Sequence, residues 1–167
     1  MFTTIAQFEK KWGHESGLTA KLLDKLTDKS LDQQICDDHR TLGRIAWHLA
    51  GSVPEMMSRT GLDFGDVDAE ASVPSTAAEI ATAYKRFTAS LLEQVKAKWD
   101  DSALQVENNM YGEQWKRCDT LHILMLHDIH HRGQMTVLMR QAGLIVSDIY
   151  GPALEGWAAY KMPVPKV

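Results

Sequence analysis

The first half of the chain contains two stretches in which apolar residues recur every three or four positions among polar ones. The first stretch covers residues 4–28, and its spacing predicts an amphipathic helix. The second runs from about Arg40 to Arg59, where we expect Pro54 to kink the helix and Gly61 to end it. The apolar positions of the two stretches are Ile5, Phe8, Trp12, Leu18, Leu22, Leu23 and Leu26, followed by Leu42, Ile45, Ala46, Leu49, Val53, Met56 and Met57.

A long connection and a third helix follow. Residues 61–75 are acidic, contain glycine and proline, and show no periodicity. Long connections of this kind often border functional sites. Thr76 and Glu79 then have the spacing of a capping box, which predicts the start of a helix. The apolar stripe of this third helix consists of Ile80, Tyr84, Phe87, Leu91 and Val95.

A second irregular stretch, residues 100–118, separates the third helix from the fourth. Its segment QVENNMYGEQWKR predicts a short hairpin. We expect the fourth helix to begin at Asp119 or Thr120, since either side chain can cap it. Gly143 is the expected end of this helix.

The remaining residues complete the expected architecture. The tail over 144–167 predicts a short helix around Leu154–Tyr160. Strand-like alternation does not persist outside the hairpin segment. We therefore expect an all-α fold, a four-helix bundle with long connections after the second and third helices and a short helical tail. A chain of this length is expected to form a single domain over residues 1–167.

Composition and charge narrow the classes of function. The net charge of −4, without a basic run, argues against nucleic-acid binding. No apolar run is long enough to predict a membrane span, and the first residues do not resemble a secretory signal. Cys36 and Cys118 are too few and too far apart for a disulfide framework or a four-cysteine zinc site. We expect both to be reduced thiols in a cytoplasmic protein.

Candidate chemistry is concentrated in the fourth helix, in the segment LHILMLHDIHHRGQM. His127 and His131 are four residues apart, so their side chains are rotated by about 40° and separated by about 6 Å along one helix face. Leu124, Met135 and Leu138 share that face, which predicts that the histidines point inward. Two buried imidazoles need partners, and one divalent ion would satisfy both.

A third ligand would have to come from another helix. His48, in the segment RIAWHLAGS, is the other histidine in an apolar helical context. It is either a third metal ligand or a core histidine bonded to a backbone carbonyl. His130 lies about 100° from His131 around the helix, so we expect it to be exposed or to support a ligand. The absence of a Glu-x-x-His motif argues against a di-iron carboxylate site.

The segments WHLAG and HDIHHRGQM resemble motifs of the DinB/YfiT-like superfamily of metal-dependent proteins. The resemblance implies a four-helix bundle, often dimeric, with His48, His127 and His131 as ligands of one divalent ion. Zinc or nickel is the expected ion, with iron and manganese as alternatives. Related proteins with assigned activities include thiol-dependent transferases and isomerases. Asp128 is a departure, because many relatives have glycine there.

These observations favour a metal-dependent enzyme that acts on a small molecule. The nucleophile would be metal-bound water or a low-molecular-weight thiol, giving hydrolase or S-transferase and isomerase chemistry. No further side chain is assigned a catalytic role. Arg132 would orient an anionic substrate or form a structural ion pair, and Gln134 would hydrogen-bond an imidazole of the site.

Two other functions are compatible with the same residues. In the first, the ion has no catalytic role and stabilises a binding or stress-response protein. In the second, adjacent His127 and Asp128 belong to an HD-type phosphohydrolase, in which the aspartate must be a direct metal ligand. The spacing disfavours the second, because Asp128 lies about 100° from His127 and away from His131.

Overall fold

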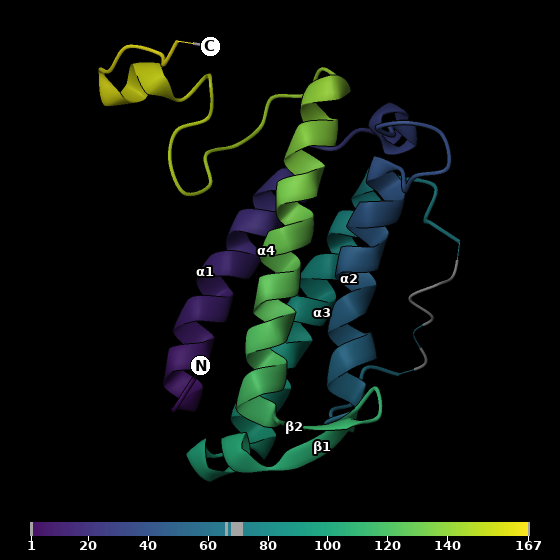
Figure 1. Ribbon diagram of the computed structural model, residues 1–167, viewed down its shortest axis with the longest axis vertical. Helices are drawn as coiled ribbons and strands as arrows, with labels where there is room; N and C mark the ends of the chain where they lie inside the picture. The colour runs from purple at the N-terminus through teal and green to yellow at the C-terminus, as the bar shows by residue number, and fades with distance from the viewer. Residues whose placement is uncertain (1, 66, 68–71, 167) are drawn as a thin grey trace.

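The computed structural model of the chain describes residues 2–65, 67 and 72–166. Four long helices pack side by side in this part of the chain, which confirms the predicted four-helix bundle (Figure 1). Three short 3₁₀ helices and a two-stranded hairpin connect or follow them. The long helices are α1 (Ile5–Leu23), α2 (Leu42–Ser58), α3 (Ala77–Lys98) and α4 (Arg117–Gln141), and the 3₁₀ helices are η1 (Asp28–Asp32), η2 (Asp101–Gln105) and η3 (Trp157–Tyr160).

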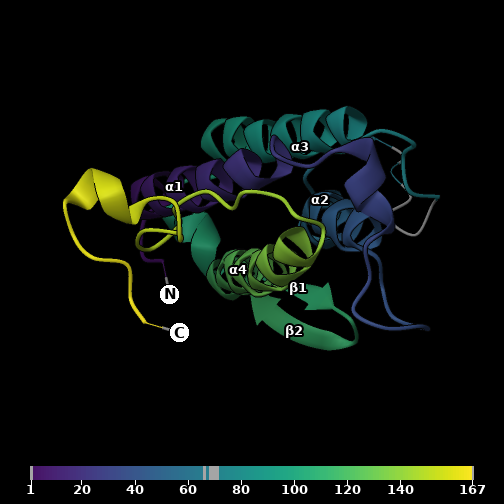
Figure 2. The same ribbon diagram turned by 90° about the horizontal axis from the view of Figure 1, so that it is seen from above.

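Viewed from above, α4 lies beside α1 on one side and α2 on the other, while α3 lies on the opposite side of the bundle from α4 (Figure 2). The two neighbours of α4 therefore meet different faces of the same helix. This arrangement decides which side chains of α4 come together at a site.

The helices α2 and α3 run in the same direction along the bundle. The backbone N–H of Ala77, at the start of α3, donates to Asp28 Oδ1 of η1 over 2.8 Å. Leu42 N–H, at the start of α2, donates to the carbonyl of Gln33, one residue after η1, so both helices begin at the same end. The chain between them must return along the whole bundle, which accounts for the long connection predicted over 61–75.

Part of this predicted connection, residues 66 and 68–71, lies outside the described residues.

The predicted hairpin is confirmed. Strands β1 (Glu107–Met110) and β2 (Glu113–Lys116) pair antiparallel, with Met110 opposite Glu113. Tyr111 and Gly112 form the turn with φ values of 59° and 95°, the positive values that a two-residue hairpin turn favours. The hairpin lies across the end of the bundle where α4 begins (Figure 1).

The first helix is shorter than predicted, since α1 ends at Leu23 and not near residue 28. The reason is a local signal that competes with the apolar spacing. The Thr27 side chain accepts from Ser30 N–H, and the Ser30 hydroxyl accepts from Thr27 N–H. This reciprocal capping starts η1 and redirects the chain.

The fourth helix begins earlier than predicted. It starts at Arg117, after Lys116, and not at Asp119 or Thr120. Arg117 N–H donates to the carbonyl of Val106, the residue before β1, so the chain leading into the hairpin satisfies a backbone donor that a capping side chain would otherwise bind.

The other helix ends differ less from prediction. Gly143 follows α4 with a φ of 77°, as expected for a glycine that ends a helix. Pro54 lies inside α2, which continues to Ser58. In the tail, helical structure is confined to η3, a shorter segment than Leu154–Tyr160.

Two apolar clusters fill the bundle, and a polar layer lies between them. Asp128, His131 and Arg132 of α4 and Glu15 and Thr19 of α1 are all buried in this layer. The cluster toward the hairpin includes Phe8, Trp12, Val53, Met57, Leu91, Met110, Leu121 and Leu124, and the cluster toward η1 includes Leu22, Leu31, Leu42, Leu49, Ile80, Tyr84, Met135 and Leu138. None of the helices in the described part of the chain combines the length and apolar character that a bilayer crossing requires.

The capping box predicted for the third helix is present and gives a test of this fold. Thr76 Oγ1 accepts from Glu79 N–H over 3.2 Å, and Glu79 Oε2 accepts from Thr76 N–H over 3.1 Å. We expect Thr76→Ala to lower the free energy of unfolding by about 1 kcal/mol in urea denaturation. Thr82→Ala, at an exposed position inside α3, is the control and should not lower it. Equal effects of the two substitutions would contradict the capping role.

Candidate metal centre

The middle of α4 brings two histidines to α2, where they meet a third. His127 Nε2 lies 3.1 Å from His131 Nε2 and 3.3 Å from His48 Nε2. One ligand atom from each of the three rings lies within 4.8 Å of the other two. The one-turn spacing on α4 therefore brings both rings to one side of the helix, and His48 reaches the same point from α2.

These distances fit a single divalent ion. Zinc binds imidazole nitrogens at about 2.0–2.1 Å, so two nitrogens of a tetrahedral site lie about 3.3 Å apart. The Nε2 separations of 3.1 and 3.3 Å are close to that value. The three histidines thus form a group that can bind a metal ion, and three protein nitrogens would leave a fourth tetrahedral position for another ligand.

The surroundings of the rings favour the neutral imidazole, which is the form that binds metal. Burial and the neighbouring rings of His131 and His48 lower the pKa of His127 to about 4. Burial also lowers the pKa of His131, although its hydrogen bond to Gln134 acts in the opposite direction. The Nδ1 atom of His127 is buried without a hydrogen-bond partner among the described residues.

Gln134 lies next to the group, as the sequence predicts. Its Oε1 is 2.7 Å from His131 Nδ1. Because this amide oxygen can only accept, Nδ1 carries the hydrogen and Nε2 keeps its lone pair toward the other two rings. Gln134 therefore selects the tautomer of His131 that can bind an ion at Nε2.

We expect Gln134→Ala to weaken Zn²⁺ binding by about tenfold, because the His131 ring loses the bond that orients it. Titration with a competing chelator measures the affinity. Gln141→Ala, at an exposed position at the end of α4, is the matched control and should bind Zn²⁺ as the unaltered protein does. If Gln134→Ala binds Zn²⁺ as tightly as the unaltered protein, Gln134 does not orient His131 for metal binding.

The opposite face of α4 carries a buried polar network toward α1. Arg132 Nη2 donates to Glu15 Oε2 over 2.7 Å, and Nη1 donates to the Glu15 carbonyl over 2.9 Å. The hydroxyl of Tyr150, from the tail, lies 2.5 Å from both Arg132 Nη2 and Glu15 Oε2. Burial alone would raise the pKa of Glu15, but the bonds from Tyr150 and Arg132 outweigh it and lower the pKa.

Asp128 belongs to the same network. Its carboxylate accepts from Thr19 Oγ1 over 2.5 Å and from Tyr84 OH over 2.7 Å, which links α4 to α1 and α3. Burial raises the pKa of Asp128 to about 6, although these two bonds act in the opposite direction. Both carboxylate oxygens are thus used in holding helices together, and Asp128 is not among the groups of possible metal ligands in the described residues. These contacts argue against the HD-type arrangement.

Arg132 is 2% exposed and its bonds point toward α1 and the tail. Of the two alternatives for this residue, its contacts support the structural ion pair, which is buried here. A role in orienting substrate has no support from these contacts.

The histidines and cysteines discussed next are not among the three clustered ligand candidates, although the ring of His130 packs edge-on against that of His131, with 5.0 Å between centroids. His14, His39 and His130 are exposed. Cys118 is buried in the apolar cluster near the start of α4, and burial raises the pKa of its thiol. Cys36 is exposed, with its Sγ 3.2 Å from His39 Nδ1. Both cysteines are free, as expected.

A cavity of about 430 Å³ adjoins the group, and His131 is part of its wall. The loop before α2 contributes His39 and Arg40, and α4 contributes Gln134. Its aliphatic wall consists of Ile35, Ile45, Val137 and Leu138.

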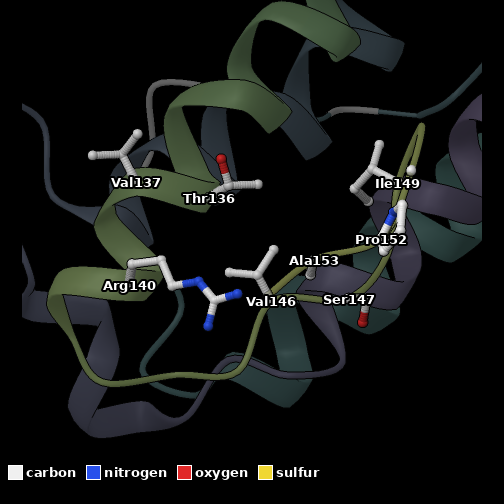
Figure 3. Close-up of a pocket in the computed structure, with 9 residues that line it drawn as sticks. Thr136, Val137, Arg140, Val146, Ser147, Ile149, Pro152 and Ala153 are labelled. Carbon is white, nitrogen blue, oxygen red and sulfur yellow. The ribbon is translucent and has the colours of Figure 1, made fainter. Parts of the chain in front are cut away.

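A second cavity, of about 330 Å³, lies between the end of α4 and the tail (Figure 3). None of the three clustered histidines lines it, and Arg140 in its wall is paired with Glu155. Of these two cavities, only the first adjoins the three-histidine group.

The sequence analysis missed the residues that bind Arg132 and Asp128. One signal was present, because Glu15 and Thr19 continue the spacing of Phe8, Trp12 and Leu22 along the buried face of α1. Polar residues on an apolar stripe indicate buried partners. For Arg40 the sequence pattern indicates only the start of a helix.

Comparison with known proteins identifies the family. Residues 1–163 match the DinB family model. The chain is 44% identical to the uncharacterized protein YrdA of Bacillus subtilis (strain 168) over 167 residues, the full length of both. The crystal structure of a DinB-like protein from Bacillus cereus ATCC 10987 has 42% identity and a TM-score of 0.86, covering 90% of this chain and all of the other.

A second DinB-like structure, YjoA from Bacillus subtilis, shares the fold with a TM-score of 0.68 at 14% identity, and the match covers 88% of this chain and 99% of the other. The family match and the relative of equal length agree with the helical bundle and the histidine motifs that led to the resemblance. The chain therefore belongs to the DinB family.

Proposed function

We propose that the protein is a metal-dependent enzyme that holds one divalent ion, zinc or nickel, on His48, His127 and His131. The observation that carries this proposal is the convergence of the three rings, with Nε2 separations of 3.1 and 3.3 Å along the group. Structural zinc sites have four protein ligands, whereas catalytic sites have three and an open position. Three clustered histidines match the second kind.

The bound ion would supply a positive charge that lowers the pKa of water or a thiol in the open position. The chain's own residues have two tasks in such a site. The lowered pKa values of His127 and His131 keep their lone pairs available at neutral pH, and Gln134 holds the His131 ring in the ligating tautomer. The cavity beside His131 gives a small molecule access to the group.

The reaction class that we favour is transfer or isomerisation in which a low-molecular-weight thiol is the nucleophile. The alternative is hydrolysis, in which water is the nucleophile. The test is a turnover screen with the Zn²⁺- and Ni²⁺-loaded protein, using thiol acceptors and esters. We expect turnover that chelation removes and re-addition of the ion restores. His48→Ala should be inactive, while His14→Ala, at an exposed position on α1, should retain activity. Turnover of the same rate in His48→Ala would remove this proposal.

A second candidate is a metal site that stabilises the fold without catalysis. The observation in its favour is that, among the described residues of the cavity wall, no carboxylate is present to act as a general acid or base. X-ray absorption of the metal-loaded protein distinguishes the candidates. Three nitrogen ligands and a solvent-derived oxygen support the enzyme, and a fourth protein ligand supports the structural site.

Homodimer formation, implied by the resemblance, is also part of the proposal. Exposed aliphatic residues on α4 support it, since Ile123, Leu126 and Val137 are 40%, 45% and 51% exposed. We expect light scattering coupled to size-exclusion chromatography to give twice the 18.8 kDa of one chain. A molar mass equal to one chain at micromolar concentration would contradict a stable dimer.

A further inference from the structure

The cavity beside the three histidines has an uneven distribution of charge. Its described wall contains one permanent cation, Arg40, and no carboxylate, although acidic residues outnumber basic ones in the whole chain. Arg40 is exposed and makes no hydrogen bond or ion pair within the described residues. Arg40 shares the cavity wall with His131, so its charge lies beside the three-histidine group.

Three other arginines of the chain are paired with glutamates and are not available in this way. Arg59 is paired with Glu55, Arg132 with Glu15 and Arg140 with Glu155. The guanidinium of Arg40 is thus available to an anion that enters the cavity, and such a bond would be charge-assisted on both sides.

The rest of the wall recognises a different part of a ligand. Four aliphatic side chains line the cavity, two of them, Ile45 and Leu138, buried at 7% and 4% exposure. A volume of about 430 Å³ lies within the range of small-molecule sites. Gln134 uses its amide oxygen on His131, which leaves its N–H groups to donate to a ligand. The cavity therefore combines an apolar surface with donors and a cation.

We propose that this cavity binds a small molecule with an apolar body and an anionic group such as a carboxylate, and that Arg40 binds the anion. The inference rests on the proposed function in one respect, namely that the reacting end of the ligand would lie at His131. It assigns to Arg40 the selection of anionic over neutral molecules.

The probes for a test are hexanoate, hexanol and hexylammonium, which share one apolar chain and differ in charge. Calorimetry with the Zn²⁺-loaded protein measures each affinity. We expect hexanoate to bind about tenfold more tightly than hexanol, and hexylammonium more weakly than either. Arg40→Gln should remove the preference for hexanoate, and Arg40→Lys should retain most of it. Arg86→Gln, which removes the same charge from α3, should leave the preference intact.

A second substitution tests the apolar wall. Ile35 is 60% exposed, so the Ile35→Ser protein should fold normally. We expect it to bind hexanoate and hexanol about threefold more weakly, by the same factor for both. The inference is overturned if hexanoate and hexanol bind equally to the unaltered protein, or if Arg40→Gln keeps the full preference.

The same titrations in His48→Ala separate this inference from the proposed function. Hexanoate could bind the ion directly, and a protein without the ion removes that contribution. A preference for hexanoate that depends on Arg40 in His48→Ala supports the cavity inference even if metal-dependent turnover fails. If the preference for hexanoate does not depend on Arg40 in the unaltered protein or in His48→Ala, the inference is overturned. The proposed function is then still tested by the metal content and turnover of the unaltered protein.

Discussion

His127→Ala is expected to abolish stoichiometric binding of a divalent ion. His127 Nε2 is the central atom of the group, because it lies within 3.3 Å of both other Nε2 atoms. Loss of a residue that merely supports a metal ligand costs about 10–100-fold in affinity, so loss of a ligand should cost more than about a hundredfold. The protein as purified should therefore fall from about one ion per chain to almost none.

Elemental analysis of the purified proteins measures this loss, and thermal unfolding with and without Zn²⁺ gives a second reading. An ion at a hundred times its dissociation constant stabilises the native state by about 2.7 kcal/mol, and His127→Ala should lose this gain. His130→Ala is the matched control, since His130 is exposed and contributes no ligand atom to the group, although its ring packs against that of His131. Equal metal content in His127→Ala and His130→Ala would contradict the site.

The second large effect is expected from Arg132→Met. This substitution leaves the Glu15 carboxylate buried without the guanidinium that binds it. Removal of one partner of a buried ion pair costs about 3–5 kcal/mol, a large part of the stability of a domain of this size. We expect the midpoint of thermal unfolding to fall by about 10 °C.

Arg140→Met is the control for Arg132→Met. Arg140 also forms a two-bonded pair with a glutamate, Glu155 of the tail, but both side chains are more than a third exposed. Solvent screens such pairs, so this substitution should leave the free energy of unfolding almost unchanged. The double variant Glu15→Gln/Arg132→Met should recover part of the lost stability, because no buried charge remains unpaired. If Arg132→Met and Arg140→Met unfold alike, the network does not stabilise the fold.

The helices of the bundle could be predicted because their cause is local. Apolar residues at threes and fours define one buried face, and the capping box at Thr76 marks the start of α3 without reference to the rest of the chain. The ends that were wrong depend on competing contacts. The end of α1 is set by capping at Thr27, and the start of α4 by a bond from Arg117 to Val106, the residue before β1.

The three histidines were predictable for a similar reason. The spacing of His127 and His131 fixes their common face within one helix, and an apolar context marks His48 as inward-facing. The convergence of the rings is a tertiary property, since His48 and His127 are 79 residues apart. The family motifs, rather than helix geometry, connected them.

The buried network could not be predicted in this way. Arg132 and Glu15 are 117 residues apart, and Asp128 and Thr19 are 109 apart. The sequence leaves two alternatives open for Arg132, an orienting role toward an anionic substrate and a structural ion pair. Which of two helix faces meets α1 and which meets α2 depends on packing that the spacing of one helix does not contain.

The position of Tyr150 has a practical consequence for shortening the chain. Its ring is largely in contact with solvent, yet its hydroxyl completes the shell of acceptors and donors around Arg132 and Glu15. A chain cut after Gly143 would keep all four long helices and still open this pair to water. Truncated versions made for crystallisation or spectroscopy should therefore retain at least residues 144–150, and a tag is better attached beyond η3.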